Sequence, residues 1–190
     1  AQSRSEKGLD SLFMAEDILD IEIRADFTSL MQDRTKDPDA YRGELIYRSP
    51  EGEERVFSIN LKPRGNFRLN PDNCKFPPLR VDFDKDEVPG TIFDNQNKIK
   101  LVTPCQFEED VVEEYVIYKM YNELTDYSLQ VRMANILFVD REQGKKIFRK
   151  HSFFIEDIDH LAERMGGEEI DRHITPFEVN PEVMKRLEVF

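Results

Sequence analysis

Short runs of alternating apolar and polar residues recur along most of this chain, and they constrain its fold more than any other feature. Residues 19–27 read LDIEIRADF, an alternation that suits a strand with one buried face. Residues 41–48 and 55–62 are joined by Ser49-Pro50-Glu51-Gly52, which is typical of a hairpin. Further β-like runs are predicted at 78–83, 98–104, 129–140 and 145–156.

One long segment has helical periodicity. Acidic residues crowd its first turns, where the helix dipole favours them, so residues 107–124 predict a helix. The apolar residues near helical spacing are Val111, Tyr115, Tyr118 and Met120. The face expected to pack on the sheet holds Val111, Tyr115, Tyr118 and Leu124. A shorter helix is expected in 156–167. Local connections and alternating strands together predict an α+β fold, with a mostly antiparallel sheet and one main packed helix.

The charge of the chain excludes some classes of partner. Its formal net charge is -12, which argues against nucleic acid and anionic membranes as general partners, because both need a basic face. No run of about 18 apolar residues occurs, so no transmembrane segment is predicted. Hydrophobic residues make up 39% of the chain, enough for a folded core. Oligomeric state stays open.

The two ends of the sequence carry their own expectations. The polar start, AQSRSEKGLD, lacks an initiator Met, as expected after removal of a signal peptide or after trimming of the chain. We expect an exported protein, with a cytoplasmic one as the alternative. Residues 180–190 begin like a helix capped by Asn180 and reach Phe190 without a stop signal, so the natural chain is expected to continue.

Positive charge gathers at residues 61–83, which hold only two acidic residues. An Arg64-Gly65-Asn66 turn lies there between two β-like runs. The basic residues of this stretch are Lys62, Arg64, Arg68, Lys75 and Arg80. This cluster of positive charge in an acidic chain has two interpretations: a binding role, or a solvated face paired with carboxylates.

The order of these motifs resembles the CotH family, the spore-coat-type atypical protein kinases and their exported bacterial relatives. The resemblance covers about residues 55–165 and includes LKPRGNFR, CKFPPLRVDF, NKIKLV and FFIEDIDHLAE. Its most specific parts are the Arg64-Gly65-Asn66 turn and residues 156–159. It implies a small β lobe with one helix that covers ATP, followed by a larger helical lobe that supplies the catalytic and metal-binding residues.

The resemblance also divides the chain into parts. It implies a flexible N-terminal segment at 1–16, a kinase-like lobe at 17–160 and the first helices of a truncated second lobe at 161–190. The implied function is the nucleotide-binding lobe of an exported protein kinase, inactive as this chain alone because no catalytic or metal-binding residue is expected within it. The alternative is a non-catalytic binding or cell-surface interaction module.

A nucleotide site around the basic turn follows from the resemblance. Gly65 lets backbone amides approach phosphate oxygens, and Arg64 and Lys75 can neutralise phosphate charge. In kinase-like sites a strand lysine holds the phosphates and a helix glutamate holds that lysine. Lysine candidates are Lys75, Lys98 and Lys100, and glutamate candidates are Glu113 and Glu114, with Lys75 and Glu114 ranked first. The full predicted set is Arg64, Gly65, Asn66, Lys75, Lys100, Glu114, Glu156 and Ile158.

In this interpretation Glu156 to Ile158 form a hinge whose backbone meets adenine. The ligand implied for the full-length protein is ATP with Mg²⁺, and a protein substrate is a candidate partner. Each feature also has a structural interpretation. The Arg-Gly-Asn sequence suits an ordinary turn, the helix acids suit dipole compensation, and Glu156 and Asp157 suit a helix cap.

The two cysteines support a pairing argument. If CKFPPLRVDF and NKIKLVTPC are antiparallel neighbours, the register that pairs Val81 with Lys98 also sets Cys74 opposite Cys105. A disulfide is then geometrically feasible and implies an oxidising compartment. The alternative is two reduced, buried thiols in a cytosolic protein.

Overall fold

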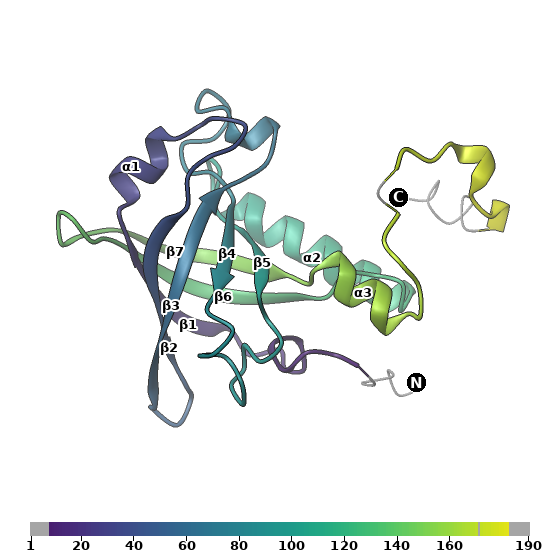
Figure 1. Ribbon diagram of the computed structural model, residues 1–190, viewed down its shortest axis with the longest axis horizontal. Helices are drawn as coiled ribbons and strands as arrows, with labels where there is room; N and C mark the ends of the chain where they lie inside the picture. Colours follow the sequence, from purple (N-terminus) through teal and green to yellow (C-terminus); the bar gives the residue numbers. More distant parts are fainter. Residues whose placement is uncertain (1–7, 171, 183–190) are drawn as a thin grey trace.

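Seven strands close into one barrel within residues 8–170 and 172–182, which are the residues that the computed structural model describes (Figure 1). The order around the barrel is β1-β2-β3-β4-β5-β7-β6, and β6 pairs with β1 to complete the ring. The strands are β1 (Leu19–Ala25), β2 (Tyr41–Arg48), β3 (Glu54–Pro63), β4 (Leu79–Phe83), β5 (Lys98–Val102), β6 (Val131–Asp140) and β7 (Lys145–Ile155).

The closed barrel shows that the predicted fold class was wrong. We expected a mostly antiparallel sheet with a helix over it, like the small lobe of a kinase. Instead β1 and β6 pair in parallel, with Ile21 beside Ile136 and Ile23 beside Phe138, and this pairing closes the sheet on itself. The neighbours in between are antiparallel. The kinase-like lobe is therefore withdrawn.

The barrel interior is filled mainly by aromatic and branched side chains. Phe93 comes from the connection between β4 and β5 and is fully buried. Its ring stacks on Phe83 and makes edge contacts with Tyr47, Phe57 and Phe154. A second aromatic cluster consists of Phe27, Phe76, Phe138 and Phe148. These contacts give the barrel a continuous packed core.

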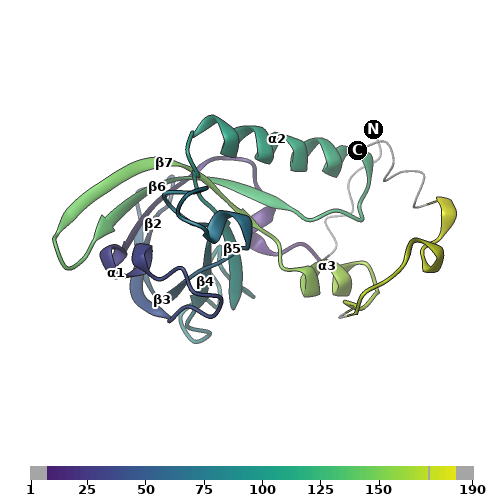
Figure 2. The same cartoon turned by 90° about the horizontal axis from the view of Figure 1, so that it is seen from above.

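The predicted long helix forms as α2 (Glu109–Leu124), and it lies outside the barrel across β6 and β7 (Figure 2). Val111 is buried there, and the rings of Tyr115 and Tyr118 pack on Phe153. This inner face was predicted. The expectation that Leu124 belongs to it was wrong, because its side chain is exposed.

Shorter helices occupy the ends of the barrel and the C-terminal part. The α-helices are α1 (Phe27–Gln32) and α3 (Ile158–Arg164), and the 3₁₀ turns are Ser11–Phe13, Phe67–Leu69 and Pro176–Glu178. The sequence had assigned Phe27 to a strand. The chain leaves that strand at Asp26, whose side chain accepts the amide hydrogen of Ser29 at 2.9 Å and caps α1.

The N-terminal segment is held by a buried arginine of β6. The Arg132 guanidinium donates to the carbonyls of Leu12, Ala15 and Asp17 and pairs with the Asp17 carboxylate at 2.9 Å. Part of the segment expected to be flexible, residues 1–7, lies outside the described residues, as do residues 183–190 of the predicted terminal helix. The three-part division of the chain stays a prediction.

Candidate functional site

An open pocket of about 430 Å³ lies between the β3–β4 connection, β5 and α2. This volume is within the usual range for small-molecule sites. Its lining residues are Arg64, Gly65, Asn66, Phe67, Arg68, Pro78, Lys100, Val102, Glu114, Tyr118, Leu129 and Ile155. Three cationic side chains therefore meet one carboxylate in a chain whose overall charge is strongly negative.

Arg64 is one of two cations in this pocket without an ion pair among the described residues. Its backbone amide donates to the Pro78 carbonyl at 2.9 Å, which fixes the start of the turn. Among the described residues, however, no hydrogen bond or ion pair is found for its half-buried guanidinium. Burial lowers the pKa of Arg64. Tyr118 and, less strongly, Glu114 oppose this shift, whereas the neighbouring charge of Arg68 strengthens it. An arginine is always charged at neutral pH, so its charge lacks a close counter-ion here.

The other two cations differ in their surroundings. Arg68 donates to the Glu114 carboxylate at 2.6 Å, which ties the turn to α2. Lys100 is half-buried on β5, in register with Arg80 and Ile155, and no ion pair is found for it within the described ranges. Arg80 is occupied by its own neighbour Asp82, at 2.7 and 2.8 Å. Arg64 and Lys100 thus remain available to an anion.

Gly65 gives this turn its shape. Its φ is +102°, a backbone conformation that favours glycine. A Cβ placed at this position would meet no atom within 4 Å, so the space in front of the backbone is open. The glycine is therefore required by conformation and not by crowding against the protein, and it leaves the turn accessible to a ligand.

An apolar wall stands beside the charged residues. Pro78, Val102, Leu129 and Ile155 contribute to it, and the Phe67 ring lies at the rim, largely exposed. Tyr118 completes the wall from α2. Burial raises the pKa of its hydroxyl, and the nearby Glu114 carboxylate raises it further. The pocket can therefore receive a molecule that carries both an anionic group and a flat or apolar part.

The structure brings together part of the predicted site. Of the predicted residues, Arg64, Gly65, Asn66, Lys100 and Glu114 line the pocket. Lys75, ranked first among the lysines, is exposed and lies outside the lining, although its carbonyl accepts from Arg34 at 2.8 Å. The glutamate of α2 is held by Arg68 and not by a lysine. Lys98 and Glu113 are exposed elsewhere on β5 and α2.

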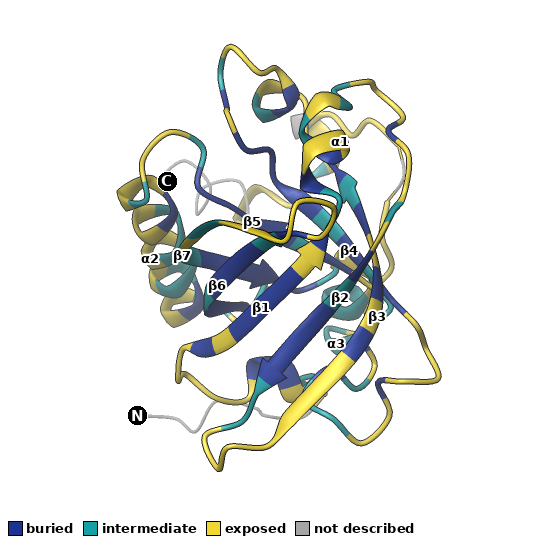
Figure 3. Cartoon of the chain, turned by 90° about the vertical axis from the view of Figure 1, so that its left-hand side faces the viewer, coloured by how far each residue is buried: buried dark blue, intermediate teal, exposed yellow. Residues whose placement is uncertain are grey.

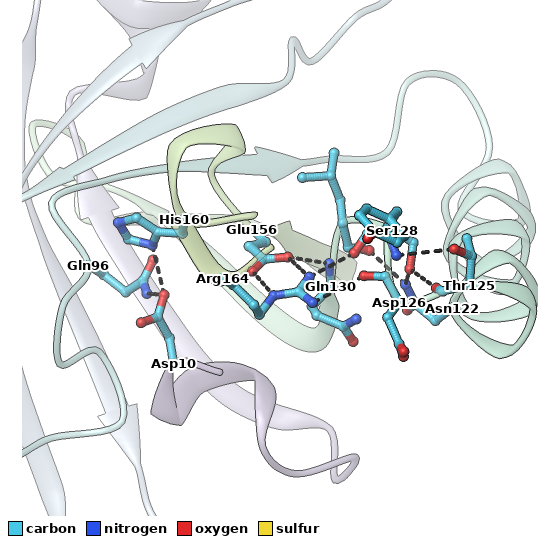
Figure 4. A network of polar contacts seen from close by, with 12 residues as sticks. Asp10, Gln96, Asn122, Thr125, Asp126, Ser128, Gln130, Glu156, His160 and Arg164 are labelled. Carbon is cyan, nitrogen blue, oxygen red and sulfur yellow. Dashed lines mark hydrogen bonds and ion pairs between the residues drawn. The ribbon is translucent and has the colours of Figure 1, made fainter. Parts of the chain in front are cut away.

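The predicted hinge residues do not line the pocket. Ile158 begins α3 and is not part of the lining, whereas Ile155, which was not predicted, is. The Glu156 carboxylate is buried against Arg164 and also accepts the amide hydrogen of Gln130 at 2.9 Å (Figure 4). Asp157 caps α3 by accepting from Asp159, so the structural interpretation of a helix cap holds for Asp157.

Sequence reasoning missed Arg68, Phe67 and Tyr118 as site residues. Arg68 belonged to the basic stretch, so its charge was a usable signal. Tyr118 was assigned only to the packing face of the helix, yet it lies at the edge of that face and also lines the pocket. Phe67 gave no signal, because an aromatic residue after a turn is usually assigned to a core.

The Cys74–Cys105 disulfide is present, with the two Cα atoms 4.6 Å apart. The predicted bond is confirmed, although the register differs by one residue, because Val81 pairs with Ile99 and not with Lys98. The bond joins the connection that carries Arg64 to the segment between β5 and α2. It therefore ties the β3–β4 connection, one element of the pocket, to the segment that links the other two, β5 and α2.

Comparison with protein-family models, curated proteins and solved structures finds no match for this chain. The CotH resemblance stays a prediction. No group of His, Cys, Asp or Glu within the described ranges is arranged to hold a metal ion. None of the described helices has the length and apolar character needed to cross a membrane.

Proposed function

We propose that this protein is a binding module whose pocket at Arg64 and Lys100 takes a phosphate-bearing ligand, with a nucleotide as the candidate. The observation that carries the proposal is the half-buried Arg64 guanidinium, for which the described residues offer no hydrogen-bonding or ionic partner. Burying a charge is costly unless it is paired, and a phosphate group would supply the missing acceptor.

The rest of the lining supports a nucleotide over a bare phosphate ion. Lys100 supplies a second charge, Gly65 leaves the turn open, and Tyr118 with its apolar neighbours offers a surface for a flat ring. Glu114 discourages a second anionic group deep in the pocket.

The disulfide supports a further part of the proposal, that the protein works after export. Disulfides persist in oxidising compartments and are rare in the cytosol. The periplasm, the cell surface and the extracellular space all meet this condition.

Nucleotide titrations monitored by ¹⁵N-HSQC NMR test the pocket, because this method detects weak binding and shows which residues are affected. We expect ATP, ADP and AMP to shift the amide signals of residues 64–68 and of Lys100. Arg64→Ala and Lys100→Ala should each raise the Kd about tenfold or more, since a hydrogen bond to a charged group contributes about 1.5–3 kcal/mol.

Two variants serve as matched controls. Arg55 is exposed near the opposite end of β3, and Lys98 is exposed two residues before Lys100 on the same strand. Arg55→Ala and Lys98→Ala should bind as wild type does. Titrations with adenosine and with pyrophosphate separate the contribution of the ring to the affinity from that of the phosphate groups. Wild-type affinity in both pocket variants, or shifts that map elsewhere on the barrel, would show that the turn is structural.

A further inference from the structure

Helix α2 is apolar on two sides, but only one side packs on the barrel. Its inner side holds Val111 and the two tyrosines that contact Phe153. Along its outer side, Figure 3 shows mostly exposed residues. The exposed apolar residues there are Val112, Val116, Ile117, Met120 and Leu124, with exposed fractions between 39% and 64%. A helix that is apolar on both sides is normally covered on both.

Four of these residues form one ridge. Val112, Val116, Met120 and Leu124 follow each other at intervals of four, the spacing that aligns side chains along a helix surface. Ridges of this type pack into the groove of another helix. The geometry therefore suits a helical partner better than a flat or irregular one.

The neighbouring N-terminal segment extends this apolar surface. Lys119 on α2 pairs with Glu16 at 2.6 Å, which places that segment beside the helix. Met14 and Ile18, on either side of Glu16, are both more than half exposed. The outer surface of α2 is thus continued by two further large apolar side chains.

Charge decides which partner fits. Glu109, Asp110 and Glu113 lie on the exposed first turns of α2, and no ion pair is found for them among the described residues. The basic residue of α2, Lys119, is already paired with Glu16. A second copy of the chain would bring the same acidic turns to the interface without new cations, so self-association is electrostatically disfavoured.

We infer that the outer face of α2 docks an amphipathic helix of another protein, one whose apolar stripe is bordered by lysine or arginine. The apolar ridge supplies the buried area, and the acidic first turns select the charge of the partner. The site is separate from the pocket, because none of the ridge residues lines it. Glu114 and Tyr118 do line it, so docking would take place directly beside the ligand site.

Fluorescence anisotropy with a synthetic peptide tests this inference. The probe is a labelled helical peptide of about three heptads with Leu at a and d and Lys elsewhere. One control peptide replaces Lys by Glu, and another has the same composition in scrambled order. We expect wild type to bind only the ordered Leu/Lys peptide at physiological salt. Glu109→Gln with Glu113→Gln should weaken binding and flatten its dependence on salt.

Variants of the ridge distinguish docking from general charge attraction. Val116→Ser with Met120→Ser should raise the Kd about tenfold. Val56→Ser, a change of an exposed valine on β3, should have no effect. Equal binding of the scrambled peptide, or wild-type affinity in the ridge variant, would overturn the proposal. A dimer in sedimentation equilibrium that the ridge variant abolishes would also overturn it, in favour of a second copy.

Discussion

The Glu156 carboxylate and the Arg164 guanidinium form a bidentate ion pair, with hydrogen bonds of 3.0 and 2.9 Å, inside the structure. Their side chains are 2% and 4% exposed. Arg164 also donates to the carbonyls of Asp126 and Ser128, and the carboxylate accepts from Gln130. The pair therefore joins α3 to the start of β6 and to the segment that follows α2.

We predict that Arg164→Met lowers the free energy of unfolding by about 3–5 kcal/mol, because it leaves the Glu156 carboxylate buried without its cation. Adding Glu156→Gln removes that charge and should restore part of the loss. Urea unfolding of the single and double variants measures the coupling. Arg172→Met is the control, since Arg172 and its partner Glu178 are both well exposed, and it should change stability by about 0–1 kcal/mol. A loss below about 1 kcal/mol in Arg164→Met would contradict the prediction.

Phe93 supplies a second prediction, about the barrel core. Phe93→Ala should cost about 3–5 kcal/mol of unfolding free energy, because its fully buried ring contacts four aromatic rings and leaves a cavity when removed. Thermal and urea unfolding test this. Phe67→Ala, at an exposed ring on the pocket rim, should leave stability within about 0.5 kcal/mol of wild type and weaken nucleotide binding. Equal stability losses in both variants would refute the distinction.

Most elements of the fold could be predicted from the sequence because their signals are local. The run 41–48 was predicted as a strand with the bounds that β2 has, and the helix predicted at 107–124 differs from α2 only at its start. Barrel closure could not be predicted in this way. It depends on the parallel pairing of β1 with β6, more than 100 residues apart, and alternation within a strand does not identify its neighbour.

The site was predictable to a similar degree. The Arg64-Gly65-Asn66 turn lies at a strand end. A glycine and basic residues at such a position predict a turn and its charge from the local sequence alone. Lys75 lies in an irregular connection beside Cys74, and nothing local determines which way such a side chain faces. The pocket itself forms only where that connection meets α2, a contact that depends on the Arg68–Glu114 pair and on the packing of α2 across β6 and β7.

A third prediction concerns the disulfide. It closes a loop over a sequence separation of 31, so replacing Cys74 and Cys105 by serine should cost about 3–4 kcal/mol of unfolding free energy. Because the bond ties the Arg64 connection to the β5–α2 segment, the double variant should also bind nucleotide more weakly at temperatures where it remains folded. Reduction of wild type should reproduce both effects. Unchanged affinity with lowered stability would show that the bond supports the barrel and not the pocket.

The last prediction follows from a carboxylate at the start of α2. Glu108 accepts the backbone amide hydrogen of His151 at 2.8 Å and lies 2.8 Å from the Nδ1 of the same residue, which ties α2 to β7. These contacts, led by the backbone hydrogen bond, hold the pKa of Glu108 below its ordinary value. Its ionised form is therefore favoured by folding.

The sign of the pH dependence follows from that lowered pKa. The contribution of Glu108 to stability is fully present above the ordinary carboxyl pKa, about 4.3, and is lost as the pH falls through the lower folded value. Glu108→Gln should therefore be less stable than wild type at neutral pH, and the gap should shrink as the pH approaches about 3. Urea midpoints over this range measure it. Glu109 is the next residue and is exposed, so Glu109→Gln should show the same dependence of stability on pH as wild type. A gap for Glu108→Gln that stays constant with pH would show that its carboxylate contributes through size and not through charge.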